Sequence, residues 1–125
     1  IRIPDPGRFE LRLMDGSANP YLLQASVLAA GINGIKNKID PGKPLNCNMY
    51  EDFAKYPNLP KLPDELDQSL KQLKQNKEMN DAFGADVINS YIKLRSTELK
   101  QFNNIERFDK SKPITKWERQ NTLDC

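Results

Sequence analysis

Residues 8–13 alternate strictly between charged and apolar side chains, in the order Arg-Phe-Glu-Leu-Arg-Leu. A period of two is typical of a β-strand with one face on an apolar core and the other face open. Side chains two positions apart share a face of a strand. The pattern therefore predicts a strand over residues 8–13 whose polar face carries Glu10 between Arg8 and Arg12.

Two interpretations of this polar face are open. The charges can form a salt-bridge lattice that only stabilises the sheet. Alternatively, the carboxylate can hold a metal ion while the arginines hold a phosphate or carboxylate group.

The residues before this strand predict a tight turn. Asp5-Pro6-Gly7 combines a fixed proline φ with a glycine that permits positive φ. Arg2 and Ile3 fit the end of a strand, so the turn would place Arg2 near Glu10. A single clear strand cannot satisfy its own ladder, so we expect its partner strands outside this chain. The start at Ile1 is also typical of a piece cut from a longer protein.

The next pattern is helical. Asn19-Pro20 is a typical N-cap followed by a first helical residue. Apolar residues then recur at three- and four-residue steps to about residue 39, and the first half is apolar nearly all round. Such a helix is buried rather than amphipathic. Gly31 and Gly34 cost about 1 kcal/mol each in a helix interior, so we expect another backbone to approach them closely.

The rest of the chain predicts a loop over residues 40–62 and a helical region over 63–125. The loop contains prolines and asparagines, with a short helical turn expected at residues 50–54. The helical region divides into helices at about 63–76, 77–83 and 85–103, the second of which ends at Gly84. A short terminal helix carrying Trp117 is expected to dock on the core or on a neighbouring subunit. The fold class is therefore α+β: one or two strands of a larger sheet, followed by a mainly helical region.

Composition excludes several classes of function. The chain has 125 residues, with 19 basic and 17 acidic residues and a net charge of +2. This balance, without a basic block carrying aromatics, argues against nucleic-acid binding, and no apolar run is long enough to cross a membrane. The absence of histidine excludes Ser-His and Cys-His catalysis within the chain. Cys47 and Cys125 are expected to be free thiols in a reducing cytoplasm, although a disulfide between them is an alternative.

The chain contains an ordered series of short motifs: Arg2-Ile3-Pro4, Arg8-Phe9-Glu10-Leu11-Arg12, Ala18-Asn19-Pro20-Tyr21, Leu28-Ala29-Ala30-Gly31, Gly34-Ile35-Lys36-Asn37-Lys38, Asp40-Pro41-Gly42 and, near its end, Thr115-Lys116-Trp117-Glu118. Taken together, these motifs closely resemble the C-terminal part of the glutamine synthetase catalytic domain. The last motif is more similar to the type III or cyanobacterial branch than to the enteric one.

The resemblance implies a Mg²⁺- or Mn²⁺-dependent ligase that uses ATP to join ammonia to glutamate through a γ-glutamyl phosphate. It implies that Glu10 binds the metal and that Arg12 holds glutamate. Arg2 matches an arginine that neutralises phosphate charge during transfer, so Arg2 and Arg12 are the expected catalytic residues. Arg8 matches a position where the family places a residue near the nucleotide. Family members assemble into stacked rings, so a homo-oligomer is expected.

The sequence also departs from the family pattern. Only Asp5-Pro6-Gly7 separates Pro4 from Arg8, which is shorter than in enteric-type enzymes and lacks their lysine near the nucleotide. A two-metal site needs more carboxylates and a histidine, so residues 1–125 alone are expected to be inactive and metal-free. Tyr50 matches a position that is adenylylated in one bacterial branch, but its neighbours differ.

Three other functions are open. A related γ-glutamyl ligase for a polyamine or another amine would share the same chemistry. A retained helical module could serve assembly or regulation without catalysis. A generic helical protein-binding domain would leave the charged strand unexplained.

Overall fold

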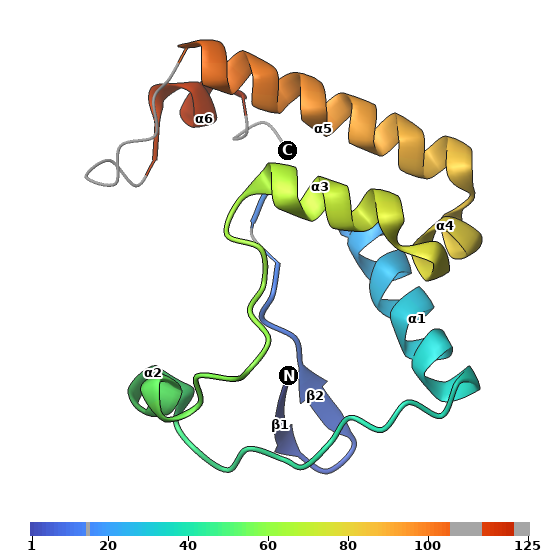
Figure 1. Cartoon of the computed structure of the whole chain (residues 1–125), viewed down its shortest axis with the longest axis vertical. Helices are drawn as coiled ribbons and strands as arrows, with labels where there is room; N and C mark the ends of the chain where they lie inside the picture. Colours follow the sequence, from blue (N-terminus) through green and yellow to red (C-terminus); the bar gives the residue numbers. More distant parts are fainter. Residues whose placement is uncertain (15, 106–113, 122–125) are drawn as a thin grey trace.

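The computed structural model describes residues 1–14, 16–105 and 114–121. A two-stranded hairpin lies at one end and a group of helices at the other (Figure 1). This confirms the α+β fold class. The elements are β1 (Arg2–Asp5), β2 (Arg8–Glu10), α1 (Pro20–Lys36), α2 (Met49–Asp52), the 3₁₀ turn η1 (Phe53–Lys55), α3 (Leu66–Gln75), α4 (Lys77–Phe83), α5 (Ala85–Ile105) and α6 (Lys116–Asn121).

The hairpin corrects two expectations about the first strand. Its partner lies within the chain, because β1 pairs with β2 in antiparallel register, with Arg2 opposite Glu10. Gly7, at φ +78°, adopts the positive φ that the turn between them requires. The strand also ends at Glu10 rather than at residue 13. Since the ladder of β1 begins at Arg2, residues 11–13 have no paired strand among the described residues.

Helix α1 begins where the sequence predicts and ends earlier than predicted. The Asn19 side chain accepts hydrogen bonds from the backbone N–H groups of Tyr21 and Leu22, and Pro20 opens the helix. The helix ends at Lys36 rather than at about residue 39. Lys38 has φ +50°, its N–H donates to the carbonyl of Ile35, and the Ile39 N–H donates to that of Gly34. These two bonds form a Schellman cap, which ends the helical pattern.

The expected burial of α1 is wrong for this chain. None of its residues is buried, and Tyr21 and Ile35 are about four-fifths exposed. A Cβ added at Gly31 or Gly34 would have no neighbour within 4 Å, so no other backbone in the described part of the chain approaches them closely. The described residues therefore cover the apolar faces of α1 only in part.

The segment after α1 is mostly irregular, and the expected helical turn is present as α2 and η1. The side chain of Asn48 accepts from the N–H of Tyr50 and begins α2. Tyr50 is almost fully exposed. Cys47 is a free thiol of intermediate exposure, while Cys125 lies outside the described residues.

Helices α3, α4 and α5, which we call the helical end, contain a small apolar core of their own. Helix α5 packs along α3 and α4, and α4 also packs against α1 (Figure 1). Leu70 of α3 and Ile88 of α5 are buried. Gly84, at φ +81°, separates α4 from α5, where the sequence predicts a break. No helix of the described residues is both long and apolar enough to cross a membrane.

Helix α6 docks on this end, as predicted for the tail. The ring of Trp117 meets Phe102 of α5 edge to face, with centroids 5.7 Å apart. Thr115 is buried, and its N–H and hydroxyl both donate to Glu118 Oε2, while the Glu118 N–H donates to Thr115 Oγ1. This reciprocal arrangement is a capping box that starts the helix.

Candidate functional site

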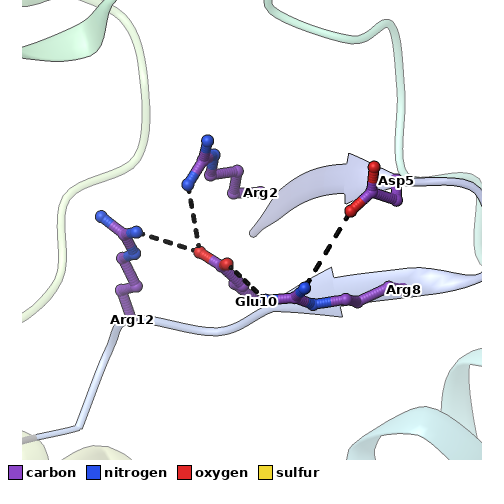
Figure 2. A network of polar contacts seen from close by, with 5 residues as sticks. All are labelled: Arg2, Asp5, Arg8, Glu10 and Arg12. Atoms are coloured by element: carbon purple, nitrogen blue, oxygen red, sulfur yellow. Dashed lines mark hydrogen bonds and ion pairs between the residues drawn. The ribbon is translucent and has the colours of Figure 1, made fainter.

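The hairpin gathers three arginines around one carboxylate, and Figure 2 shows them converging on Glu10. Arg12 Nη2 donates to Glu10 Oε2 at 3.0 Å, and Arg8 Nη2 donates to Oε1 at 3.1 Å. Arg2 Nη1 reaches Oε2 across the strand pair at 3.4 Å. We call these four residues the arginine clasp. The structure thus brings together every site residue that the sequence predicts.

Local structure explains this convergence. Arg8, Glu10 and Arg12 follow one another at steps of two, which places their side chains on one side of an extended backbone. Arg2 joins them because the register of the hairpin sets it directly opposite Glu10. The turn at Asp5-Pro6-Gly7 pairs Asp5 with Arg8, and an irregularity in the ladder between Arg2 and Asp5 then sets Arg2 opposite Glu10.

Exposure differs within the clasp. The Glu10 side chain is 24% exposed, whereas each of the three arginine side chains is more than 60% exposed. The guanidinium groups therefore shield the carboxylate while keeping open surface of their own. A guanidinium has five N–H donors, so each retains donors that could face a bound anion.

The arginines also control the charge of Glu10. The hydrogen bond from Arg12 lowers the pKa of Glu10 below its ordinary value, partial burial opposes this, and the charge of Arg2 lowers it further. A carboxyl group with a lowered pKa is ionised at neutral pH. Glu10 is thus held as an anion.

Asp5 is a neighbour of the clasp that the sequence did not point out. Its Oδ2 lies 4.0 Å from Arg8 Nη1 (Figure 2), and its side chain is 69% exposed. The cluster then holds three positive charges against two negative ones. The sequence does indicate this contact, because Asp5 lies three residues before Arg8, on the other side of the predicted turn.

The clasp fits a divalent cation only in part. An ionised, partly exposed carboxylate is a ligand that Mg²⁺ and Mn²⁺ accept. However, the described residues contain no group of three or more histidine, cysteine or acidic side chains placed to hold a metal ion. Glu10 is therefore suited to be one ligand of a site whose other ligands come from elsewhere.

A separate cavity of about 250 Å³ lies between α1 and the helical end. Its lining is mainly apolar, with Leu22, Phe83 and Ile88 among the residues. Two of its polar side chains are already engaged, since Asn19 caps α1 and the Ser26 hydroxyl donates to the carbonyl of Leu22. The cavity has no charged lining residue, so it does not suit ATP or glutamate.

Comparisons with known proteins agree with the arrangement of the hairpin and helices. Residues 1–121 match the model of the glutamine synthetase catalytic domain. A glutamine synthetase of Rhizobium meliloti (strain 1021) is 41% identical over 124 residues, which are 99% of this chain and 27% of that protein. A glutamate–methylamine ligase of Methyloversatilis universalis is 57% identical over 51 residues, which are 41% of this chain and 11% of that protein.

A solved structure is also similar to nearly the whole of this chain. A GmaS/ADP complex superimposes with a TM-score of 0.75 at 36% identity, over 98% of this chain and 26% of that one. The chain thus spans about a quarter of the length of the Rhizobium meliloti glutamine synthetase and of this solved structure. The type III or cyanobacterial branch stays a prediction. The match over nearly the whole chain shows that it belongs to the glutamine synthetase family, as part of the catalytic domain.

Proposed function

We propose that these residues form the C-terminal part of an ATP-dependent ligase that makes glutamine from glutamate and ammonia through a γ-glutamyl phosphate. The observation that carries this proposal is the arginine clasp, in which three guanidinium groups surround one ionised carboxylate. Cationic groups placed at developing phosphate charge are the main source of catalysis in phosphoryl transfer. Family membership supplies the reaction to which that chemistry belongs.

Each member of the clasp has a proposed role. Arg12 binds a carboxylate of glutamate, for which a planar guanidinium fork is well shaped. Arg2 stabilises the phosphoryl group as its charge shifts during transfer. Both are catalytic residues in this proposal, and Arg8 lies toward the nucleotide.

Glu10 is the proposed metal ligand. Bound Mg²⁺ or Mn²⁺ would neutralise phosphate charge and orient the transferred group. Glu10 supplies one oxygen ligand, and the other ligands lie outside the described residues. Residues 1–125 by themselves are accordingly proposed to be inactive and metal-free, and turnover by this piece alone would refute that.

The test uses the full-length protein with ATP, Mg²⁺ and glutamate, and it measures phosphate release with and without ammonium. Ammonium-dependent release supports the proposal. A lack of release with every amine tested would contradict it and would favour a non-catalytic assembly module.

A related γ-glutamyl ligase for another amine is the second candidate. One observation favours it: the relative named as a glutamate–methylamine ligase shares 57% identity over 51 residues. The same assay with methylamine or a polyamine in place of ammonium separates the two. If only an alkylamine supports release, the phosphoryl chemistry stands and the amine substrate is different.

Three further properties are proposed on family grounds. The full-length protein is expected to be cytoplasmic. It is also expected to form a homo-oligomer of stacked rings, and a measurement of its size in solution would test this oligomeric state. Tyr50 is exposed enough to be modified, and mass spectrometry of the native protein would show whether it is adenylylated.

A further inference from the structure

One face of helix α1 is apolar and largely exposed. Its side chains are Tyr21, Leu28, Ile32 and Ile35, whose spacing of seven, four and three residues places them on one side of the helix. They are 82%, 63%, 42% and 80% exposed, respectively. We call these four residues the outer face of α1.

The opposite side of α1 already has a partner. Leu22, Leu23 and Ser26 line the cavity between α1 and the helical end, and all three are only partly exposed. Helix α4 packs against α1 (Figure 1). In the described part of the chain, the helical end therefore covers one side of α1 and leaves the outer face open.

The sequence of α1 is typical of a helix that is covered on both sides. Residues 20–35 contain no Asp, Glu, Lys or Arg, whereas the shorter α3, which has an open side, carries Asp67, Lys71 and Lys74. A helix that is apolar nearly all round is buried in a larger protein or in a membrane. Since no helix of the described residues can cross a membrane, the outer face needs a protein surface as its partner.

The hairpin has a second apolar surface without a partner. Phe9 lies between Arg8 and Glu10 in β2, so its side chain points away from the arginine clasp. Phe9 is 59% exposed, and Ile3 of β1 is 75% exposed. Apart from the pairing of β1 with β2, no element of the described residues packs extensively on the hairpin. Two separate apolar surfaces are thus left open.

The amount of chain outside residues 1–125 indicates what covers these surfaces. The residues belong to a catalytic domain, yet they correspond to only 27% of the relative from Rhizobium meliloti. A two-fold dimer through the outer face would place that face against itself and would leave the apolar surface of the hairpin open. The remainder of the same domain can cover both.

We propose that the outer face of α1 docks on the part of the catalytic domain that lies outside residues 1–125 of the same polypeptide. The docking partner is an apolar surface, because an unpaired charge facing these side chains would lose its hydration. Helix α1 is then a central helix, with the helical end on one side and the rest of the domain on the other. The inference rests on family membership and is independent of the proposed ligase chemistry.

The experiment is site-specific photo-crosslinking in the full-length protein. The photoreactive residue p-benzoylphenylalanine replaces Tyr21 and, in a second protein, Tyr50. Tyr50 is a matched control, because it is also a tyrosine and is mostly exposed in this structure. After irradiation, a denaturing gel separates crosslinks between two chains from crosslinks within one chain, and mass spectrometry identifies the crosslinked peptides.

The expected product joins position 21 to a peptide outside residues 1–125 of the same chain, with the mass of one chain on the gel. The variant at Tyr50 should not give this product. Equal yields of it from both positions, or no crosslink from position 21, would overturn the proposal. A crosslink from position 21 to a second chain would also overturn it, as would one to another part of residues 1–125.

Two further measurements keep the test decisive if the Tyr21 variant does not fold. The same replacement at Ile35 probes the other end of the outer face, with the same expected product. In the wild-type protein, N-acetylimidazole should acetylate Tyr21 at least about tenfold more slowly than Tyr50, because a covered side chain reacts only through local opening. Equal rates would overturn the proposal.

The outcome can be separated from that of the proposed function. A protein that gives the expected crosslink but no ammonium-dependent phosphate release would refute the ligase and leave this inference intact. A protein that is active but lacks the crosslink would overturn this inference alone.

Discussion

The two ends of this chain hold their side chains together by opposite means. The hairpin is joined by charge: Glu10 and its three arginines all lie within residues 2–12, and the arginines are mostly exposed. The helical end is joined by apolar packing, with Leu70 and Ile88 coming from different helices. The comparison shows that the proposed chemistry is local in the sequence, whereas the stability of the structure is spread over several elements.

This difference predicts that substitutions at the two ends have separable effects. Changes in the arginine clasp should alter catalysis and leave the helices stable. Changes in the helical core should do the reverse. The following predictions for the full-length protein run from the largest expected effect to the smallest.

Arg12→Lys should lower kcat/KM for glutamate by about 100- to 1,000-fold, the range observed when one stabilising donor is removed from an active site. A lysine keeps the charge but loses the fork that holds a carboxylate through two parallel bonds. Steady-state kinetics at varied glutamate would measure the loss. The melting temperature should stay unchanged. A variant that loses stability together with activity would contradict the proposal that the clasp affects catalysis without affecting the stability of the helices.

Ile88→Ala should weaken the helical end by about 2 kcal/mol, the lower part of the range for buried isoleucine. Ile88 is 5% exposed and lies where α5 packs on its neighbours. Native-state hydrogen exchange would detect faster exchange in α3 and α5. Leu94→Ala is a matched control on the same helix, since Leu94 is 55% exposed, and it should cost much less.

Removal of the aromatic contact between α5 and α6 should have a smaller effect. A double-mutant cycle of Phe102→Leu and Trp117→Leu should give a coupling energy of about 0.5–1.5 kcal/mol, as for other edge-to-face pairs. The rings are 5.7 Å apart at an interplanar angle of 79°. Additive effects of the two substitutions would mean that the pair does not hold α6 in place.

The smallest predicted effect concerns an exposed ion pair in α3. The hydrogen bond from Lys71, 2.9 Å away, holds the pKa of Asp67 below its ordinary value. A group with a lowered pKa stabilises the fold above its unfolded-state pKa of about 4, and this contribution is lost as pH falls through the lowered value. NMR titration should show the Asp67 pKa rising in Lys71→Met, and an unchanged pKa would contradict this assignment.

Much of the local structure could be predicted from the sequence because short-range signals specify it. The turn at Asp5-Pro6-Gly7, the Asn19 cap and the break at Gly84 all depend on residues next to one another. The same holds for most of the arginine clasp, since a step of two and one tight turn bring its members together, although the shift in register that sets Arg2 opposite Glu10 is not visible in the sequence. The roles of these residues in binding and catalysis stay predictions.

The errors arose where structure depends on distant residues. The strand stops at Glu10 because its partner strand begins opposite that residue, which the alternation of side chains does not reveal. Helix α1 is expected from its sequence to be buried because it is apolar nearly all round, yet the described residues cover it only in part: α4 packs against it, and none of its residues is buried. Periodicity identifies an apolar face, but burial also requires the partner that packs on it.

The most direct test of the central proposal compares Glu10→Gln with Asp5→Asn in the full-length protein, by ammonium-dependent phosphate release with ATP, Mg²⁺ and glutamate. Glu10→Gln should lose about 100-fold or more of the wild-type rate, because the proposed metal ligand is removed, whereas Asp5→Asn should remain within about twofold of it. Equal rates in all three proteins would contradict the assignment of Glu10 to the centre of a ligase site.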